Sequence, residues 1–271
     1  MILRGETERG SWELVHRAPH PLLAPYVRSG YEGFTQAMRT PVRRLEVPHA
    51  GIVLIIGLGP AIDVDGASHS SFAAGLYDAP VVVTDDGHQA CVEVILTPLG
   101  ARMLLGMPMR ELTGQTVALG DLLVREPSEQ LAALRGWPAR FAALDAFLLR
   151  RLREARKPRP DVAYAWSRLE AARGNVPVAE LCRELGCRAR HLSARFGEEV
   201  GMAPKAFSRV LRFERAAALL AAGTTPAEAA ATCGLADQPH LNREFRALAG
   251  CTPAAFATAV RNVQDGLGIA A

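Results

Sequence analysis

One pattern of residues occurs twice between Leu181 and Phe256, and this repeat constrains the fold more than any other feature of the sequence. Each copy holds a glycine, a His-Leu pair, a phenylalanine, a second glycine, a proline and a last phenylalanine. The first copy is Gly186, His191, Leu192, Phe196, Gly201, Pro204 and Phe207, and the second is Gly234, His240, Leu241, Phe245, Gly250, Pro253 and Phe256. Every spacing after the histidine is identical, so we interpret the copies as one supersecondary unit used twice.

The residues around both copies predict helices throughout. In each copy a glycine stands between two short apolar-periodic segments, as the tight turn of a helix-turn-helix requires. Asp161 and Asp237 can act as N-caps, and Thr225 to Glu228 is a capping box with Pro226 at the first helical position. We therefore expect seven helices, over residues 161–173, 178–185, 189–199, 204–222, 226–233, 237–248 and 253–262.

The first part of the sequence predicts β-structure instead. Short β-branched or apolar runs alternate with Gly, Pro, Asp and His, at about ten-residue spacing, which favours a sandwich or an open barrel. The expected strands are residues 12–16, 42–47, 52–58, 61–64, 70–76, 81–83 and 91–96. A short helix is expected at 22–29.

Helical patterns return after Pro98. Short helices are expected at 99–105, 119–123 and 128–134, and Pro138 begins a longer one with an apolar stripe of Phe141, Leu144, Leu148 and Leu152. Packing of this stripe against the strand domain is the favoured interpretation. A seam between two subunits is the alternative.

The charge is distributed unevenly between the two parts. The chain has a net charge of +3. Residues 1–149 hold 12 Arg and 16 acidic residues, whereas residues 150–271 hold 19 Lys or Arg and 12 acidic residues. A basic half suggests a polyanionic partner, although basic surface can also serve solubility alone. We expect a β-rich domain at 1–149, a basic linker at 150–160, a helical domain at 161–262 and a tail at 263–271.

Other features of composition exclude several classes of protein. The apolar runs are far shorter than the ~20 residues of a membrane span. The N-terminus lacks the apolar segment of a signal peptide. Five scattered cysteines fit a reducing compartment better than a disulfide framework. The expected location is therefore the cytoplasm, without membrane association.

The helical half resembles the DNA-binding domain of the AraC/XylS family of transcription regulators. The second unit carries the specific part of the resemblance, with Ala229, Ala230, Cys233, Gly234, Leu235, Asp237, Gln238, Leu241, Arg243, Phe245, Arg246, Gly250, Thr252, Pro253 and Phe256. The resemblance implies that the second helix of each unit lies in the DNA major groove. It also implies that the helix at 204–222 holds the two readers about one DNA turn apart, roughly 34 Å.

The same resemblance places the DNA contacts on particular residues. In the first unit they are Arg190, Ser193 and Ala194, and in the second they are Gln238, Pro239, His240 and Arg243. Arginine can form two hydrogen bonds to guanine, and glutamine can form two to adenine. Each such pair is worth ~1 to 3 kcal/mol of discrimination against other bases. Arg195 points to one side and can reach a phosphate instead. Arg188 stands where the family usually has an N-cap serine, which predicts a loss of about 1 kcal/mol of capping.

The N-terminal half resembles the domain found on a subset of AraC-type regulators. The resemblance rests on residues 23–27, 48–51 and 99–106 and implies a cupin-like domain for effector sensing or dimerisation. Cys182, Cys187 and His191 in the helical half have nearly the spacing of a zinc site, but a closed site needs four ligands, and Cys182 is expected to be buried in its helix. His49, His69, His88 and Glu93 in the β-rich half match no metal motif. No metal and no cofactor is therefore expected.

The overall fold class is therefore α+β, with an N-terminal β-sandwich or cupin-like barrel and a C-terminal all-α domain containing two helix-turn-helix units. The expected function is a non-enzymatic, effector-responsive transcription regulator that binds double-stranded promoter DNA. RNA polymerase is a further expected partner, and a homodimer is compatible with the sequence. A metal-dependent cupin-type enzyme fused to a DNA-targeting module is the alternative. The sequence does not indicate the effector, the promoters or whether the protein activates or represses transcription.

Overall fold

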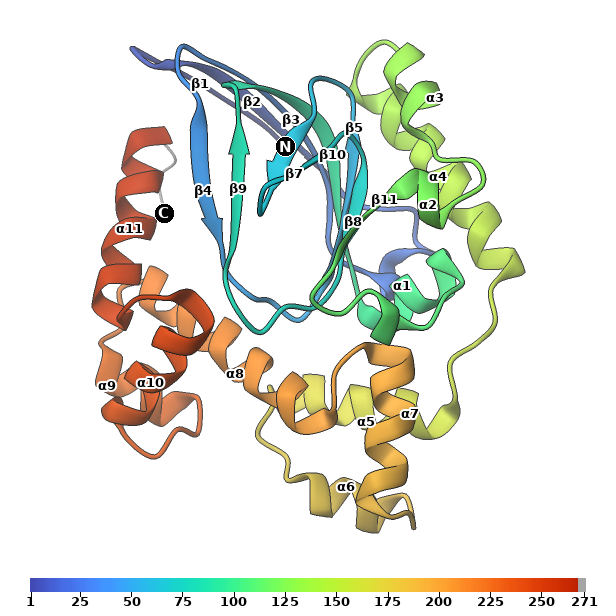
Figure 1. Cartoon of the computed structure of the whole chain (residues 1–271), viewed down its shortest axis with the longest axis vertical. Coiled ribbons are helices and arrows are strands. Elements are labelled where there is room, and N and C mark those ends of the chain that lie inside the picture. Colours follow the sequence, from blue (N-terminus) through green and yellow to red (C-terminus); the bar gives the residue numbers. More distant parts are fainter. Residues whose placement is uncertain (268–271) are drawn as a thin grey trace. The chain divides into compact units, whose positions relative to one another are not determined.

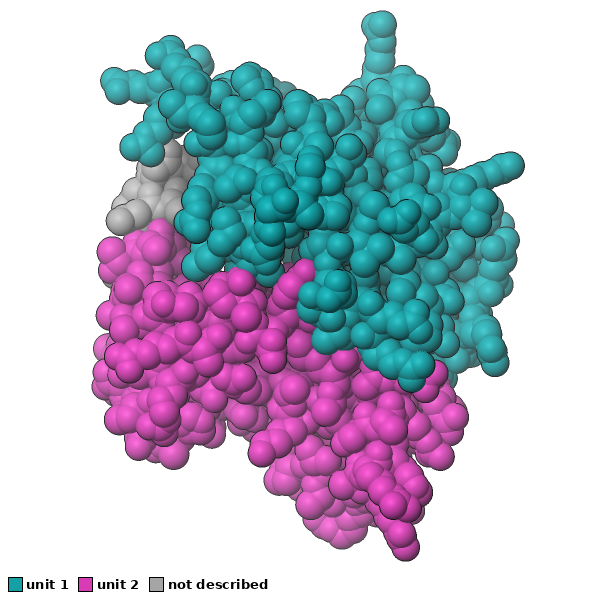
Figure 2. Space-filling view, in the orientation of Figure 1, with its two compact units in different colours: residues 1–46, 51–75, 81–158 teal, residues 47–50, 76–80, 159–271 magenta. Residues whose placement is uncertain are grey.

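The computed structural model describes residues 1–267 (Figure 1). The chain separates into two compact units, which Figure 2 distinguishes by colour. Unit 1 holds residues 1–46, 51–75 and 81–158, and unit 2 holds 47–50, 76–80 and the chain from Arg159 onward. Each unit is described separately below.

Unit 1 is built on two antiparallel sheets, as expected for an N-terminal β-rich domain. The larger sheet has the strand order β1 (Ile2–Thr7), β2 (Gly10–Arg17), β3 (Val27–Met38), β10 (His88–Leu96), β5 (Ile52–Gly57), β8 (Phe72–Ala74) and β11 (Thr116–Ala118). The smaller sheet has the order β4 (Val42–Glu46), β9 (Val81–Asp85), β6 (Ile62–Val64) and β7 (Ala67–His69). β3 and β10 pair over most of their length, so they form the middle of the larger sheet.

The helices of unit 1 cover the face of the larger sheet that is turned away from the smaller one (Figure 1). They are α1 (Pro98–Leu105), α2 (Leu119–Leu122), α3 (Ser128–Ala133) and α4 (Trp137–Glu154). Phe141, Leu144 and Leu148 of α4 are buried, and the Phe141 ring lies 6.0 Å from that of Tyr31 on β3. The apolar stripe of α4 thus packs inside unit 1, as the favoured interpretation predicted.

The helix expected at 22–29 does not form. Only a 3-10 turn occurs there, η1 (Ala24–Tyr26), and Val27 already begins the longest strand, β3. From Val27 the chain can pair with β10 over many residues, and it buries Tyr31 completely. Long-range pairing outweighs the local helical tendency, which a single sequence does not reveal.

A buried carboxylate ties α4 to the segment before β3. Asp145 is 7% exposed and accepts hydrogen bonds from the Tyr31 hydroxyl and the His20 backbone N–H, both at 2.9 Å. Arg17 approaches its other oxygen at 3.5 Å. Burial first, and then the Asp145 carboxylate, raise the pKa of Tyr31, so its hydroxyl stays a donor.

The start of the expected linker at 150–160 is helical in the structure. α4 continues to Glu154 because Arg151 binds within unit 1, where its guanidinium donates to the carbonyls of Leu104 and Leu105. These carbonyls belong to the last turn of α1 and have no partner within that helix. Only residues 155–159 join α4 to the next helix.

The described part of unit 2 contains the seven expected helices. They are α5 (Pro160–Ala171), α6 (Val178–Glu184), α7 (Ala189–Val200), α8 (Pro204–Ala221), α9 (Pro226–Thr232), α10 (Gln238–Ala249) and α11 (Pro253–Leu267). α11 extends five residues beyond the expected end at 262, so part of the expected tail is helical, and residues 268–271 lie outside the described residues. Asp161 is not the N-cap of α5, because Pro160 occupies the first helical position and Arg159 precedes it.

No helix in the described part of the chain is both long enough and apolar enough to cross a membrane.

Candidate nucleic-acid interface

The first helix-turn-helix unit consists of α6 and α7. Gly186 stands in the turn with φ of +59°, a left-handed conformation that glycine adopts without steric cost. The turn is closed by a hydrogen bond from the Cys187 N–H to the Cys182 carbonyl, at 3.0 Å. Leu192 and Phe196 of α7 are buried, and the Phe196 ring meets that of Phe207 on α8 edge to face at 5.8 Å. The inner face of α7 is thereby fixed on α8.

The second unit, α9 and α10, repeats this arrangement with stronger end caps. The Thr225 side chain accepts from the Glu228 N–H while Glu228 accepts from the Thr225 N–H, so the predicted capping box is confirmed. Asp237 caps α10 by accepting from the His240 N–H at 2.7 Å, also as predicted. By contrast, Arg188 precedes α7 without a side-chain cap, in agreement with the expected loss. The N-terminus of α10 is therefore better capped than that of α7.

Glycine is required at Gly234 for a second reason besides its φ of +68°. A Cβ at this position would lie 2.4 Å from the side-chain oxygen of Asn175, whereas a Cβ on Gly186 would meet nothing within 4 Å. The turn of the second unit thus packs closely against the chain between α5 and α6.

A rigid helix joins the two units. α8 has 18 residues, which corresponds to about 27 Å of axial length. Phe213 of α8 lies 4.8 Å from Phe245 of α10, ring to ring, and Phe245 also meets Phe256 of α11. Aromatic contacts therefore fix both α7 and α10 to α8, α7 near the N-terminus of α8 and α10 near its middle.

All the residues expected to contact DNA in the first unit lie on the outer side of α7. Arg190, Ala194 and Arg195 are exposed, and Ser193 is half-buried. His191 is exposed as well. Arg190 and Ala194 thus lie opposite the buried Leu192 and Phe196, and Ser193 and Arg195 lie beside that buried face.

The second unit presents its expected contact residues in the same way. Gln238, Pro239 and Arg243 are exposed on α10, and His240 is half-buried. Among the described residues none forms a hydrogen bond or ion pair with the guanidinium of Arg243, and the same holds for Arg190. These two arginines are available to a base edge without the loss of an intramolecular partner.

Other cations on the reading helices already have carboxylate partners. Arg195 donates to Asp161 of α5 at 2.7 Å. His240 lies 3.7 Å from Glu244, whose other oxygen accepts from Arg209 of α8 at 2.5 Å. The His240 and Glu244 spacing of four residues on one helix was visible in the sequence. The pairing of Arg195 with Asp161, from different helices, was not.

The two histidine-containing sets considered as metal clusters are not assembled into sites. Among the described residues, no group of three or more His, Cys, Asp or Glu side chains is arranged to hold a metal ion. Cys182 is partly exposed rather than buried, and burial is the main cause of its raised pKa, followed by the neighbouring Cys187. This environment disfavours the thiolate that a nucleophile or metal ligand requires.

Comparison with known proteins identifies both parts of the chain. Residues 181–259 match the family of helix-turn-helix domains, and residues 15–118 match a domain of unknown function (DUF6597). Residues 181–259 form an AraC-type helix-turn-helix domain. The helix-turn-helix match covers unit 2 from α6 into α11, and the α+β fold class with two helix-turn-helix units is confirmed.

The chain is also similar to several solved structures. ToxT from Vibrio cholerae is 12% identical, with 84% of this chain and 98% of ToxT covered and a TM-score of 0.49. A ToxT structure with bound unsaturated fatty acid is 10% identical, with coverages of 82% and 96% and a TM-score of 0.44. The C-terminal domain of AraT, a response regulator from Geobacillus stearothermophilus, is 20% identical, with coverages of 38% and 88% and a TM-score of 0.36. No curated protein matches the chain.

Proposed function

We propose that this AraC-type regulator reads two successive major-groove segments of promoter DNA, with α7 in one and α10 in the next. The exposure of Arg190 and Arg243 on matching helices, fixed to a single spacer, carries this proposal. Two readers on one rigid spacer add their base contacts, while phosphate contacts set the register.

The reading residues have different chemical capacities. Arg190 and Arg243 are suited to guanine, and Gln238 to adenine. Ser193 and His240 can form single hydrogen bonds, whereas Ala194 and Pro239 offer only apolar contact, for example to a thymine methyl. Arg195 is suited to a phosphate. The second unit therefore supplies more of the sequence discrimination than the first.

We further propose that unit 1 senses a small molecule and thereby alters DNA binding by unit 2, in the cytoplasm and in contact with RNA polymerase. This role is supported by the presence of a separate β-rich unit in a chain whose DNA-binding function is already accounted for by α5 to α11. A measurement of the protein's mass in solution will show whether it is a homodimer.

The test of the reading assignment is the substitution Arg243→Ala. Loss of one bidentate base contact costs ~1 to 3 kcal/mol, or roughly 5- to 150-fold in affinity for the selected site. The target site is first selected from a random DNA pool, and affinity is then measured for that site and for unrelated DNA of equal length.

Arg246→Ala is the matched control, because Arg246 is exposed on the same helix but is not among the expected base contacts. It should weaken binding to both DNAs equally. If wild type and Arg243→Ala bind the selected site equally well, Arg243 does not contact a base and this part of the proposal is wrong.

A further inference from the structure

The middle strand of the larger sheet has one face of unusual chemistry. β10 is hydrogen-bonded to β3 on one side and β5 on the other. Val92, Val94 and Leu96 are buried, as expected of a central strand. The alternating positions on the other face are Gln89, Cys91, Glu93 and Ile95. A carboxylate therefore stands where a central strand ordinarily places an apolar side chain.

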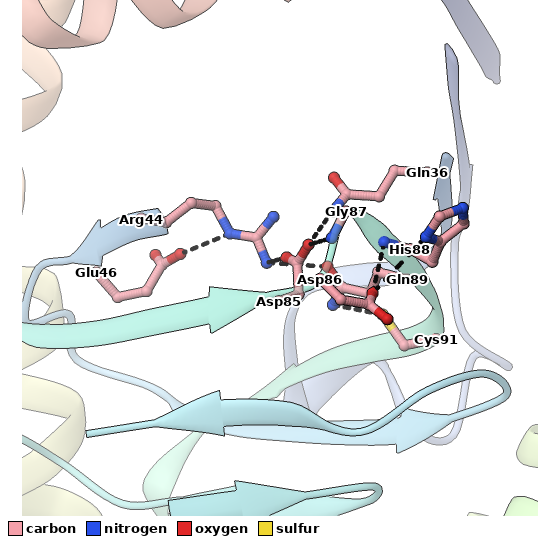
Figure 3. A network of polar contacts seen from close by, with 9 residues as sticks. All are labelled: Gln36, Arg44, Glu46, Asp85, Asp86, Gly87, His88, Gln89 and Cys91. Carbon is pink, nitrogen blue, oxygen red and sulfur yellow. Dashed lines mark hydrogen bonds and ion pairs between the residues drawn. The ribbon is translucent and has the colours of Figure 1, made fainter. Parts of the chain in front are cut away.

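This second face is turned towards the smaller sheet. Figure 3 shows Arg44 of β4 donating to the side chain of Gln89 at 2.9 Å, and Gln36 of β3 donating to Asp85 of β9 at 2.8 Å. Both hydrogen bonds run between the two sheets. Glu93, four residues after Gln89 on the same face of β10, consequently lies on the inner side as well.

Glu93 is held in an unfavourable position. It lies directly opposite Glu32 in the antiparallel pairing of β10 and β3, and like charges placed opposite each other destabilise a sheet. Glu93 is partly buried, and desolvation by this burial is the main cause that raises its pKa to about 7. Glu32 and then Glu46 raise the pKa further, and only Arg44 opposes them. Among the described residues none donates a hydrogen bond to Glu93.

The nearby guanidinium of Arg44 already binds other side chains. Its Nη2 lies 3.2 Å from the fully buried carboxylate of Asp85 and donates to Gln89, and its Nε lies 3.8 Å from Glu46 (Figure 3). Arg44 is thus shared among three carboxylates, those of Glu46, Asp85 and Glu93. The region carries an excess of negative charge that the protein itself does not neutralise.

Solvent reaches this region. The side chain of Glu32 is 39% exposed although β3 has neighbours on both sides, and that of His16 beside it, 3.9 Å from Glu32, is 36% exposed. Arg44 and Glu46 on the facing sheet are 31% and 60% exposed. Glu93 itself is only partly buried, so the smaller sheet does not seal the inner face.

We propose that this inner face of unit 1 binds a small organic cation, an amine or guanidinium compound, through Glu93 with Glu32 and Glu46. The proposal rests on the sensor role proposed above for unit 1 and names the chemical class of its effector. A cation hydrogen-bonded to Glu93 supplies the donor that the carboxylate lacks and removes the repulsion from Glu32. A structure that keeps a destabilising carboxylate pair at an accessible place is typical of a binding site.

The test uses the full chain above pH 7, where Glu93 is ionised. Calorimetric titrations use 1,4-diaminobutane and agmatine as probe cations, with 1,4-butanediol as a neutral probe and magnesium as an inorganic cation. We expect both organic cations to bind and the diol and magnesium not to bind. Glu93→Gln should weaken cation binding at least about tenfold, as expected for the loss of a charge-assisted hydrogen bond.

Glu129→Gln is the matched control, because Glu129 is an exposed carboxylate of the same unit on α3. It should leave cation binding unchanged. Glu32→Gln provides a second variant in case Glu93→Gln does not fold, and it should also weaken binding. Absence of binding of both cations at millimolar concentration, equal binding by the glutamine variants, or equal binding of the diol or magnesium overturns the proposal.

DNA binding is measured on the same preparations. Binding to the selected DNA without cation binding refutes this inference alone, because the reading function is then intact. Cation binding without any effect on DNA affinity refutes the sensor role and leaves the site itself standing.

Discussion

Arg195, which we propose as a phosphate contact, is paired with the carboxylate of Asp161. The two side chains meet at 2.7 Å and are 43% and 25% exposed, so the pair is partly solvated. Such pairs are worth about 0.2–1 kcal/mol. If α7 binds DNA as proposed, Asp161 competes with DNA for Arg195, whereas Arg243 on α10 has no such competitor among the described residues.

Replacing Asp161 by asparagine should release Arg195 for phosphate contact. We expect a roughly two- to fivefold gain in affinity for unrelated DNA at low salt, and a slope of affinity against salt that is steeper by about one. Affinity is measured over a series of salt concentrations.

Two controls accompany this substitution. Glu184→Gln removes a comparable partner from Arg168, away from α7, and should leave the slope unchanged. Arg195→Ala should reduce the slope more in the Asp161→Asn background than in the wild type. Weaker binding of Asp161→Asn would instead show that Asp161 orients Arg195 for its contact.

The ionisation of Glu93 predicts a pH dependence of stability. Its pKa is raised from the ordinary value of 4.5 to about 7 in the folded protein, chiefly by burial. Between these values the folded state holds a proton that the unfolded state has lost, so stability falls as pH rises through this window. Melting temperatures of wild type and Glu93→Gln, measured from pH 4.5 to 8, should converge at the acid end and diverge towards pH 7. Parallel curves would contradict this origin of the dependence.

At the scale of single elements, α7 and α10 differ at their N-termini. Asp237 caps α10, whereas Arg188 gives α7 no side-chain cap. Arg188→Ser introduces a residue that can accept from the first turn of α7, and we expect a gain of about 1 kcal/mol in the free energy of unfolding. Urea unfolding provides the measurement, and Thr225→Ala, which removes the cap of α9, should cost a similar amount.

The attachment of α4 to the sheet depends on Asp145. Asp145→Ala leaves the Tyr31 hydroxyl and the His20 N–H without their buried acceptor. The expected loss is about 2–4 kcal/mol, because more than one buried donor becomes unsatisfied. Tyr31→Phe removes only one of these hydrogen bonds and should cost about 1 kcal/mol. Equal losses in both variants, measured by urea unfolding, would show that the His20 contact contributes little.

At the scale of the whole molecule, the proposed reading of two DNA segments requires a rigid α8. The helix is continuous over 18 residues and is packed against both reader helices. We expect protection of two major-groove segments on one face of the DNA, one turn apart. Insertion of 5 base pairs between the segments should abolish the contribution of one unit, and insertion of 10 should not restore it. Recovery with 10 base pairs would mean that α8 bends or breaks on DNA.

The sequence alone determined the features that depend on near neighbours along the chain. The repeat, the capping box of Thr225 and Glu228, the cap at Asp237 and the turn glycines all act within four or five residues, so their patterns are readable without a fold. The α+β division and the seven helices of unit 2 followed from such signals. The placement of the eight expected DNA contacts stays a prediction, although their outward orientation agrees with it.

Only the tertiary structure decided which distant residues meet. The strand that replaces the expected helix at 22–29 forms because β3 pairs with β10, about sixty residues away in the sequence. The same pairing sets Glu32 against Glu93, and the packing of α5 on α7 sets Asp161 against Arg195. Register and helix packing fix these contacts, and both are chosen by the burial of whole faces rather than by any local motif. Local chemistry thus specified the two helix-turn-helix units, and long-range packing specified the charges that surround them.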